Sequence, residues 1–89
     1  MSAEKLVARY ISSAGQVLKS IELLEQPDSV TMEQTRKVVE SADAYFKDAK
    51  YYRDQGRFDV GLASIAYCEG LLDGLRLLGL ARFEWPKTR

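Results

Sequence analysis

The sequence predicts an all-α fold, an antiparallel three-helix bundle that ends in a short C-terminal tail. Three segments carry apolar side chains at steps of three and four, the spacing of one helical face. Turn residues separate these segments, at Pro27, Gly56 and Gly79. Because the connections are short, we expect neighbouring helices to be antiparallel, in up-down-up order. The 89 residues are expected to form one domain, since domains commonly have about 100–150 residues.

The first predicted helix covers residues 3–25. Ser2 is a candidate N-cap, because its hydroxyl can accept a hydrogen bond from a backbone N–H of the first turn. The periodic apolar face of this helix consists of Val7, Tyr10, Ile11, Ala14, Val17, Leu18, Ile21 and Leu24.

The second predicted helix covers residues 32–55. Thr31 and Gln34 have the spacing of a capping box, in which each side chain binds the other residue's backbone N–H. Gly56 follows where many helices end in a left-handed backbone conformation. The core-facing stripe consists of Thr35, Val38, Val39, Ala42, Tyr45, Phe46, Ala49 and Tyr52.

The third predicted helix covers residues 58–78, and a tail follows over residues 80–89. Its core stripe consists of Phe58, Leu62, Ile65, Cys68, Leu72 and Leu75. A second apolar side consists of Val60, Ala63, Tyr67, Gly70, Leu71, Gly74, Leu77 and Leu78. A helix that is apolar nearly all round is buried on more than one side. We therefore expect a cover for this second side, either the tail with Phe83 or Trp85 packed on the bundle end, or another chain.

Glycines within the third helix point the same way. Each of Gly61, Gly70 and Gly74 costs about 0.5–1 kcal/mol relative to alanine, so tight packing is expected to compensate. The close contact lies either within the chain or between two chains. The second alternative makes this helix an interface for a homodimer or another protein partner. The candidate interface residues are Ala63, Tyr67, Gly70, Leu71, Gly74 and Leu78.

The composition argues against several classes of partner. The 13 Lys and Arg balance the 13 Asp and Glu, so the basic excess of a nucleic-acid-binding protein is missing. Only the tail is basic, through Arg82, Lys87 and Arg89. We see no apolar run of the roughly 20 residues that span a membrane. A single cysteine, Cys68, and no visible signal peptide predict a cytoplasmic protein.

The usual groups of enzyme chemistry are missing from the sequence. The chain has no histidine, the commonest general base and metal ligand. One cysteine cannot build a Cys-based zinc site, and Cys68 lies on the core stripe as a small apolar side chain. No Gly-rich phosphate-binding loop is visible. We therefore expect no catalytic residue, no metal and no cofactor, and interpret the chain as a non-enzymatic protein.

A weaker candidate is a polar ligand site made by Lys50, Glu69, Asp73 and Arg76. Glu69 and Asp73 stand one helical turn apart, and such carboxylates could hold Mg²⁺ or act as an acid–base pair. The alternative is a solvated strip in which Asp73 simply pairs with Arg76.

Residues 45–80 contain the motifs Asp48-Ala49-Lys50-Tyr51, Gly56, Tyr67, Gly70, Leu72, Asp73 and Leu78-Gly79-Leu80. Through these motifs the segment resembles the small archaeal proteins known as domain of unknown function 357. Glu69 departs from the family pattern, because histidine or a residue other than glutamate is expected before this glycine. The resemblance implies an all-helical archaeal cytoplasmic protein and no activity.

Three hypotheses for the function follow, of which the third is an enzyme of a type that the sequence does not identify. The first is an interaction module that self-associates or binds a protein partner through the third helix. The second is a small-molecule or nucleotide-binding helical domain, since the helix-turn-helix rhythm is also similar to HEPN domains. Ribonucleases of that group use an arginine and a histidine, and this chain contains no histidine.

Overall fold

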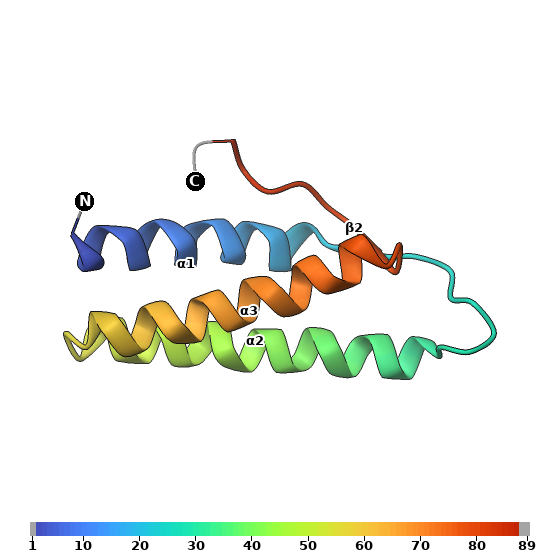
Figure 1. Ribbon diagram of the computed structural model, residues 1–89, viewed down its shortest axis with the longest axis horizontal. Coiled ribbons are helices and arrows are strands. Elements are labelled where there is room, and N and C mark those ends of the chain that lie inside the picture. The colour runs from blue at the N-terminus through green and yellow to red at the C-terminus, as the bar shows by residue number, and fades with distance from the viewer. Residues whose placement is uncertain (1, 88–89) are drawn as a thin grey trace.

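The computed structural model describes residues 2–87, and within them three long helices pack side by side (Figure 1). The elements are α1 (Ala3–Ser20), β1 (Glu22–Leu23), α2 (Met32–Asp54), α3 (Phe58–Leu77) and β2 (Ala81–Arg82). The helices run up, down and up, so the predicted all-α antiparallel bundle is confirmed. Arg89, at the basic end of the predicted tail, lies outside the described residues.

Capping groups set most of the helix ends. The Ser2 hydroxyl accepts a hydrogen bond from the backbone N–H of Lys5 at 3.2 Å, which satisfies one free donor of α1. At the start of α2, Gln34 N–H donates to the Thr31 hydroxyl at 3.1 Å, and Thr31 N–H donates to the Gln34 side chain at 2.9 Å. These two bonds form the capping box. Gly56 ends the turn after α2 with a φ of 75°, which glycine adopts without strain.

Helix α1 ends at Ser20, before the predicted end near residue 25. Ile21 is extended, with φ −60° and ψ 134°. The chain then forms β1, which pairs antiparallel with β2 so that Glu22 lies opposite Arg82. The backbone N–H of Leu24 donates to Leu80 O at 3.0 Å. The long-range pairing therefore replaces the last helical turns, and the expected helix over residues 21–25 is wrong.

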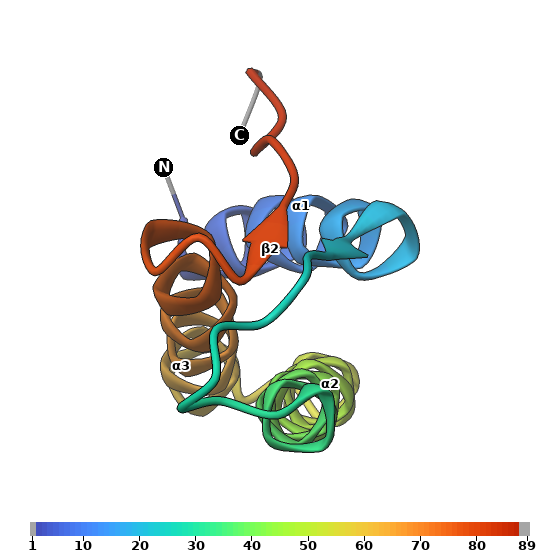
Figure 2. The ribbon, with the colours of Figure 1, turned by 90° about the vertical axis from the view of Figure 1, so that its right-hand side faces the viewer.

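The tail folds back beside α1 and joins the core (Figures 1 and 2). Leu80, Ala81 and Phe83 are buried, and the Trp85 ring meets the Phe83 ring edge-on with centroids 5.1 Å apart. An exposed ion pair closes the strand pair, since Arg82 Nε and Nη2 lie 2.9 and 2.8 Å from Glu22 Oε2. The tail thus packs along the bundle through a two-residue ladder, which no local pattern in the sequence predicts.

The core lies between the three helices. Its apolar members are Val7, Ile11, Ala14, Val17, Ala42, Ala49, Ile65, Cys68, Leu72, Leu75, Leu80, Ala81 and Phe83. Helix α2 contributes only small apolar residues to this buried set, Ala42 and Ala49. The backbones of α2 and α3 can approach closely because these side chains are small.

Gly61 lies where α3 approaches both other helices. A Cβ atom at this position would lie 3.4 Å from Ala49 O in α2 and 3.5 Å from Val7 Cγ1 in α1. A methyl group would fill the remaining space, and a longer side chain has no room. The close packing that the sequence predicts for the glycines of the third helix therefore lies within the chain at Gly61.

We predict that Gly61→Leu destabilises the fold. The extra atoms must separate α3 from α1 and α2, and overpacking of this kind costs about 1–3 kcal/mol in the free energy of unfolding. Urea unfolding followed by circular dichroism measures this loss. The matched control is Ala44→Leu, which places the same leucine side chain at an exposed position of α2. Equal stabilities of the two variants would show that Gly61 is not a tight contact.

Candidate functional site

One side of α3 faces away from both α1 and α2 within the described chain (Figure 2). Three large apolar residues lie exposed near this side: Tyr67 at 56%, Leu77 at 72% and Leu78 at 74%. Exposed large apolar side chains of a monomer commonly occur singly, whereas these three lie together on the second half of α3 and its C-cap. This face is the leading candidate for a functional surface.

The exposed side is organised as a seam. Six residues follow alternating steps of three and four, the spacing at which one helix packs along another. We call them the α3 seam: Val60, Ala63, Tyr67, Gly70, Gly74 and Leu77. All six are exposed or half-buried, and none carries a charge. The seam extends over nearly the whole of α3, from its first turn to its last residue.

The structure distributes the six candidate interface residues over two environments. Ala63, Tyr67, Gly70 and Leu78 are exposed, whereas Gly74 and Leu71 are half-buried and Leu71 packs against the core. Leu77 belongs to the predicted second apolar side but not to these candidate interface residues. Its position three residues after Gly74 indicates in the sequence that the two residues share a helix face.

Gly70 and Gly74 face open space. A Cβ atom at either position would meet no atom of another described residue within 4 Å. Packing within the described chain therefore does not require glycine there, in contrast to Gly61. These two glycines leave a flat, sidechain-free stretch in the middle of the seam.

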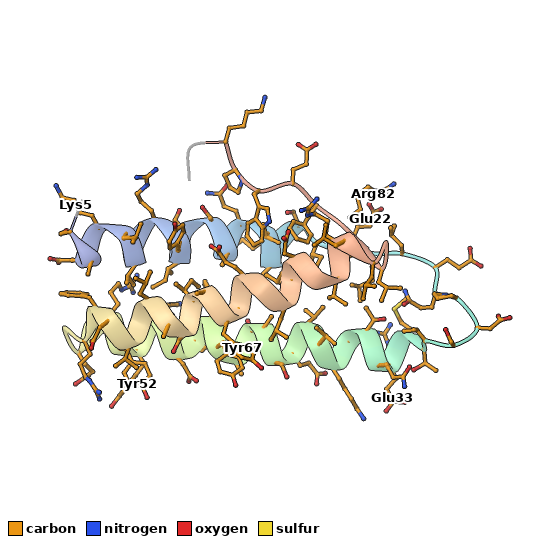
Figure 3. All side chains as sticks on the ribbon, in the orientation of Figure 1. Lys5, Glu22, Glu33, Tyr52, Tyr67 and Arg82 are labelled. Carbon is orange, nitrogen blue, oxygen red and sulfur yellow. The ribbon has the colours of Figure 1, made fainter. Side chains whose placement is uncertain are left out.

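Tyr67 projects beside this stretch, and its ring is held from the other side. The Tyr45 ring of α2 lies 4.4 Å from it, centroid to centroid, at an interplanar angle of 35°. Figure 3 shows Tyr67 at the border between α3 and α2. The stacked ring loses little further conformational freedom on binding, because the contact already restricts it.

The predicted polar residues lie on a different side of α3. Glu69, Asp73 and Arg76 line a hollow of about 480 Å³, which Tyr10 of α1 and Trp85 of the tail complete. Ala66 and Gly70 also line it, and their small size leaves the space open. This volume falls within the range of small-molecule sites, about 300–1,000 Å³.

Asp73 connects the tail to α3 in this hollow. Its Oδ1 accepts hydrogen bonds from Arg76 Nε at 2.9 Å and from Trp85 Nε1 at 3.0 Å. This ion pair between Asp73 and Arg76 is the alternative to a ligand site that their spacing in the sequence predicts. The bond from Trp85 was not predicted, because nothing in the sequence shows that the tail returns to this helix.

Lys50 does not join this group. It lines a second hollow, between α1 and α2, and its Nζ lies 5.3 Å from the centroid of the Phe46 ring. The expectation of one polar site that includes Lys50 is therefore wrong. Lys50 lines one hollow, and Glu69, Asp73 and Arg76 line the other.

Cys68 is fully buried on the core side of α3. Burial raises the pKa of its thiol to about 12, and the charges of Glu69 and Asp43 add to this effect. The thiol therefore stays protonated at neutral pH, and a protonated thiol is a poor nucleophile and metal ligand.

Within residues 2–87, no cluster of three or more histidine, cysteine, aspartate or glutamate side chains could hold a metal ion. Among the described helices, none combines the length and apolar character needed to cross a membrane.

Comparison with known proteins gives one family. The family described as "Protein of unknown function (DUF357)" matches residues 9–81, which include most of α1, the other two helices and the first residue of β2. No curated protein and no solved structure matches the chain.

We predict that Asp73→Ala releases the tail from α3. The variant removes the acceptor of both Arg76 and Trp85, so the indole becomes solvated and the emission of this single tryptophan shifts to longer wavelength. The free energy of unfolding is expected to fall by about 1 kcal/mol. The control is Asp43→Ala, which removes the Lys47–Asp43 ion pair on α2 and leaves Trp85 in place. Identical emission spectra for the two variants would contradict the role of Asp73.

Proposed function

The chain belongs to the DUF357 family, whose function is not known, and we propose that it is a non-enzymatic interaction module that self-associates through the α3 seam. One observation carries this proposal: α3 exposes a continuous, uncharged apolar seam on the side that faces away from the rest of the bundle.

The energetics favour covering this surface. Complete burial of a leucine side chain is worth about 1.5–3 kcal/mol, and Leu77 and Leu78 are both mostly exposed. Gly70 and Gly74 allow a second helix backbone to approach closely, which increases the number of van der Waals contacts. A helix that packs on the seam would therefore bury apolar surface without leaving a charge unpaired.

A second copy of the chain suits the seam better than a charged partner. The seam has no charged residue with which to recognise one. The chain also has a formal net charge of zero, so two copies do not repel each other at long range. A domain of this size buries only about two-thirds of its unfolded surface, and a dimer adds to that burial.

Chemical features of the chain support a function without catalysis. The sequence has no histidine, and the only cysteine is buried with a raised thiol pKa. Asp73 and Arg76, which face the hollow, pair with each other. These features leave surface recognition as the better supported activity.

We predict that the wild-type chain has the solution mass of a dimer, twice the 10.1 kDa of one chain. Light scattering after gel filtration measures this mass. Gly74→Leu fills the flat part of the seam, and Leu77→Lys places a charge on it, so each is expected to raise the dissociation constant at least about tenfold. Neither residue fills the core, so circular dichroism spectra should remain those of the wild type.

Ala44→Leu, on the exposed side of α2, is the control and should stay dimeric. A wild-type mass of one chain at about 100 μM would reject self-association, because a dimer that forms only above this level is weaker than most specific complexes. A dimer that survives both seam variants would place the interface elsewhere, for example near Tyr51, which is 59% exposed on α2.

A second candidate function is the binding of a small molecule in the hollow between Tyr10 and Trp85. Its charged lining consists of two carboxylates and one guanidinium, which disfavours the phosphates of a nucleotide and favours a cation. The aromatic rings can also hold a cationic group. The nucleotide alternative is therefore less well supported than an amine.

We predict for this candidate that phenethylamine raises the unfolding temperature and saturably changes the emission of Trp85, whereas ATP with Mg²⁺ does neither. Binding to the folded state alone stabilises it, and 1 kcal/mol corresponds to about 4–8 °C for a domain of this size. Benzyl alcohol is the neutral control. The absence of a shift with phenethylamine would remove this candidate and leave the seam proposal unaffected.

A further inference from the structure

We infer that two copies of this chain pair antiparallel through the α3 seam, with Tyr67 of each copy seated on Gly70 of the other. This inference depends on the proposed self-association and goes further, because it names the register and the direction of the two helices. It follows from the order of side-chain sizes along the seam, from the backbone dipole of α3, and from the contact that holds Tyr67.

The spacing of the seam is the same in both directions. Its steps are three, four, three, four and three, so the seam can face a reversed copy of itself without any shift. The centre of this arrangement lies between residues 68 and 69. Facing positions are then Val60 with Leu77, Ala63 with Gly74, and Tyr67 with Gly70.

The sizes of the facing side chains match in this arrangement. The largest residue of the seam, Tyr67, meets a glycine whose Cβ position is open, and the small Ala63 meets the second glycine. Packing of large against small residues lets two helices come close without voids. The aliphatic pair Val60 and Leu77 closes both ends of the seam.

A parallel pairing lacks this match. It would place Tyr67 against Tyr67, with Gly70 against Gly70 one turn later. The two rings would hold the helices apart at the level where the glycines need a close approach, and a void would form between the glycines. Since void and strain both oppose tight packing, the antiparallel direction is favoured.

The backbone dipole of α3 favours the same direction. Antiparallel pairing places the positive end of one helix beside the negative end of the other, whereas parallel pairing brings like ends together. The side-chain charges favour neither direction, because Arg57 and Asp59 stand together at the start of α3 and Asp73 pairs with Arg76 near its end.

The rest of the bundle leaves room for this contact. The tail packs on the side of α3 that faces α1, and Tyr45 supports Tyr67 from α2, so neither element covers the seam within the described residues (Figure 2). Leu71 and Leu78 border the seam on its other edge and extend the apolar contact. The Tyr67 ring, held by Tyr45, is therefore a preformed projection, and the flat glycine stretch of the other copy has room for it.

Disulfide trapping tests the direction and the register. Ala63→Cys and Gly74→Cys are made separately, oxidised alone, and oxidised as an equal mixture. In the antiparallel pair, residue 63 of one copy faces residue 74 of the other, within the Cα separation of up to about 7 Å that a disulfide allows. Two copies of residue 63 lie 11 residues apart along the axis, roughly 16 Å at 1.5 Å per residue.

We expect a covalent dimer only in the mixture, with the mass of one chain of each variant. The wild-type chain, whose Cys68 is buried, and a mixture of Ala44→Cys with Gly74→Cys are the controls and should stay uncrosslinked. Light scattering of the same samples under reducing conditions reports whether they self-associate.

Each other outcome overturns one idea. Crosslinking of each single variant with itself indicates a parallel pair. A dimer under reducing conditions that forms no crosslink on oxidation indicates another surface or register. Both results reject the antiparallel register, and the first is still consistent with self-association through the seam. If light scattering under reducing conditions gives the mass of a single chain for the wild type and for both variants, the proposed function itself is rejected.

Discussion

The burial of one side of α3 is the constraint on which the rest of the structure depends. Ile65, Cys68 and Leu72 are fully buried there, between the apolar faces of α1 and α2. Gly61 brings the backbone of α3 against Ala49 O at the turn end of the hairpin, so the first part of α3 is held tightly. Since one side of α3 serves both neighbours, its opposite side has no partner among the helices (Figure 2).

The tail covers only one part of the α3 surface that α1 and α2 leave exposed. Directly after the turn at Gly79, β2 pairs with β1, which fixes the direction of the tail toward α1. Phe83 then enters the core, and Trp85 binds Asp73 from the α1 side. The seam on the other side stays exposed because the tail is already committed to the groove between α1 and α3.

Local signals in the sequence predicted the elements that local chemistry determines. The capping box at Thr31 and the left-handed turn at Gly56 set the start and end of α2, and the apolar periodicity identified the core side of α3. The end of α1 was predicted wrongly, because the apolar periodicity of α1 continues to Leu24, whereas residues 22–24 pair with residues 80–82 instead. Local propensity cannot show such a tertiary contact.

In the candidate site, too, local sequence predicts some features and tertiary contacts determine the others. Periodicity placed Tyr67 and Gly70 on a second apolar side, but it could not show which glycine packs within the chain and which faces solvent. The grouping of Lys50 with Asp73 failed because charge and helix position alone do not show which helix faces which. The sequence could predict that a surface needed a cover, and only the structure shows that the tail does not provide it.

Gly70 links the two candidate functions. It belongs to the seam and also lines the hollow beside Trp85. A second copy seated on the seam therefore lies over one edge of the hollow and changes the space that a small molecule would occupy. When two binding events share a residue, each alters the affinity of the other by the same factor. A ligand of the hollow would act on self-association in this way, through a glycine that has no side chain to separate the two surfaces.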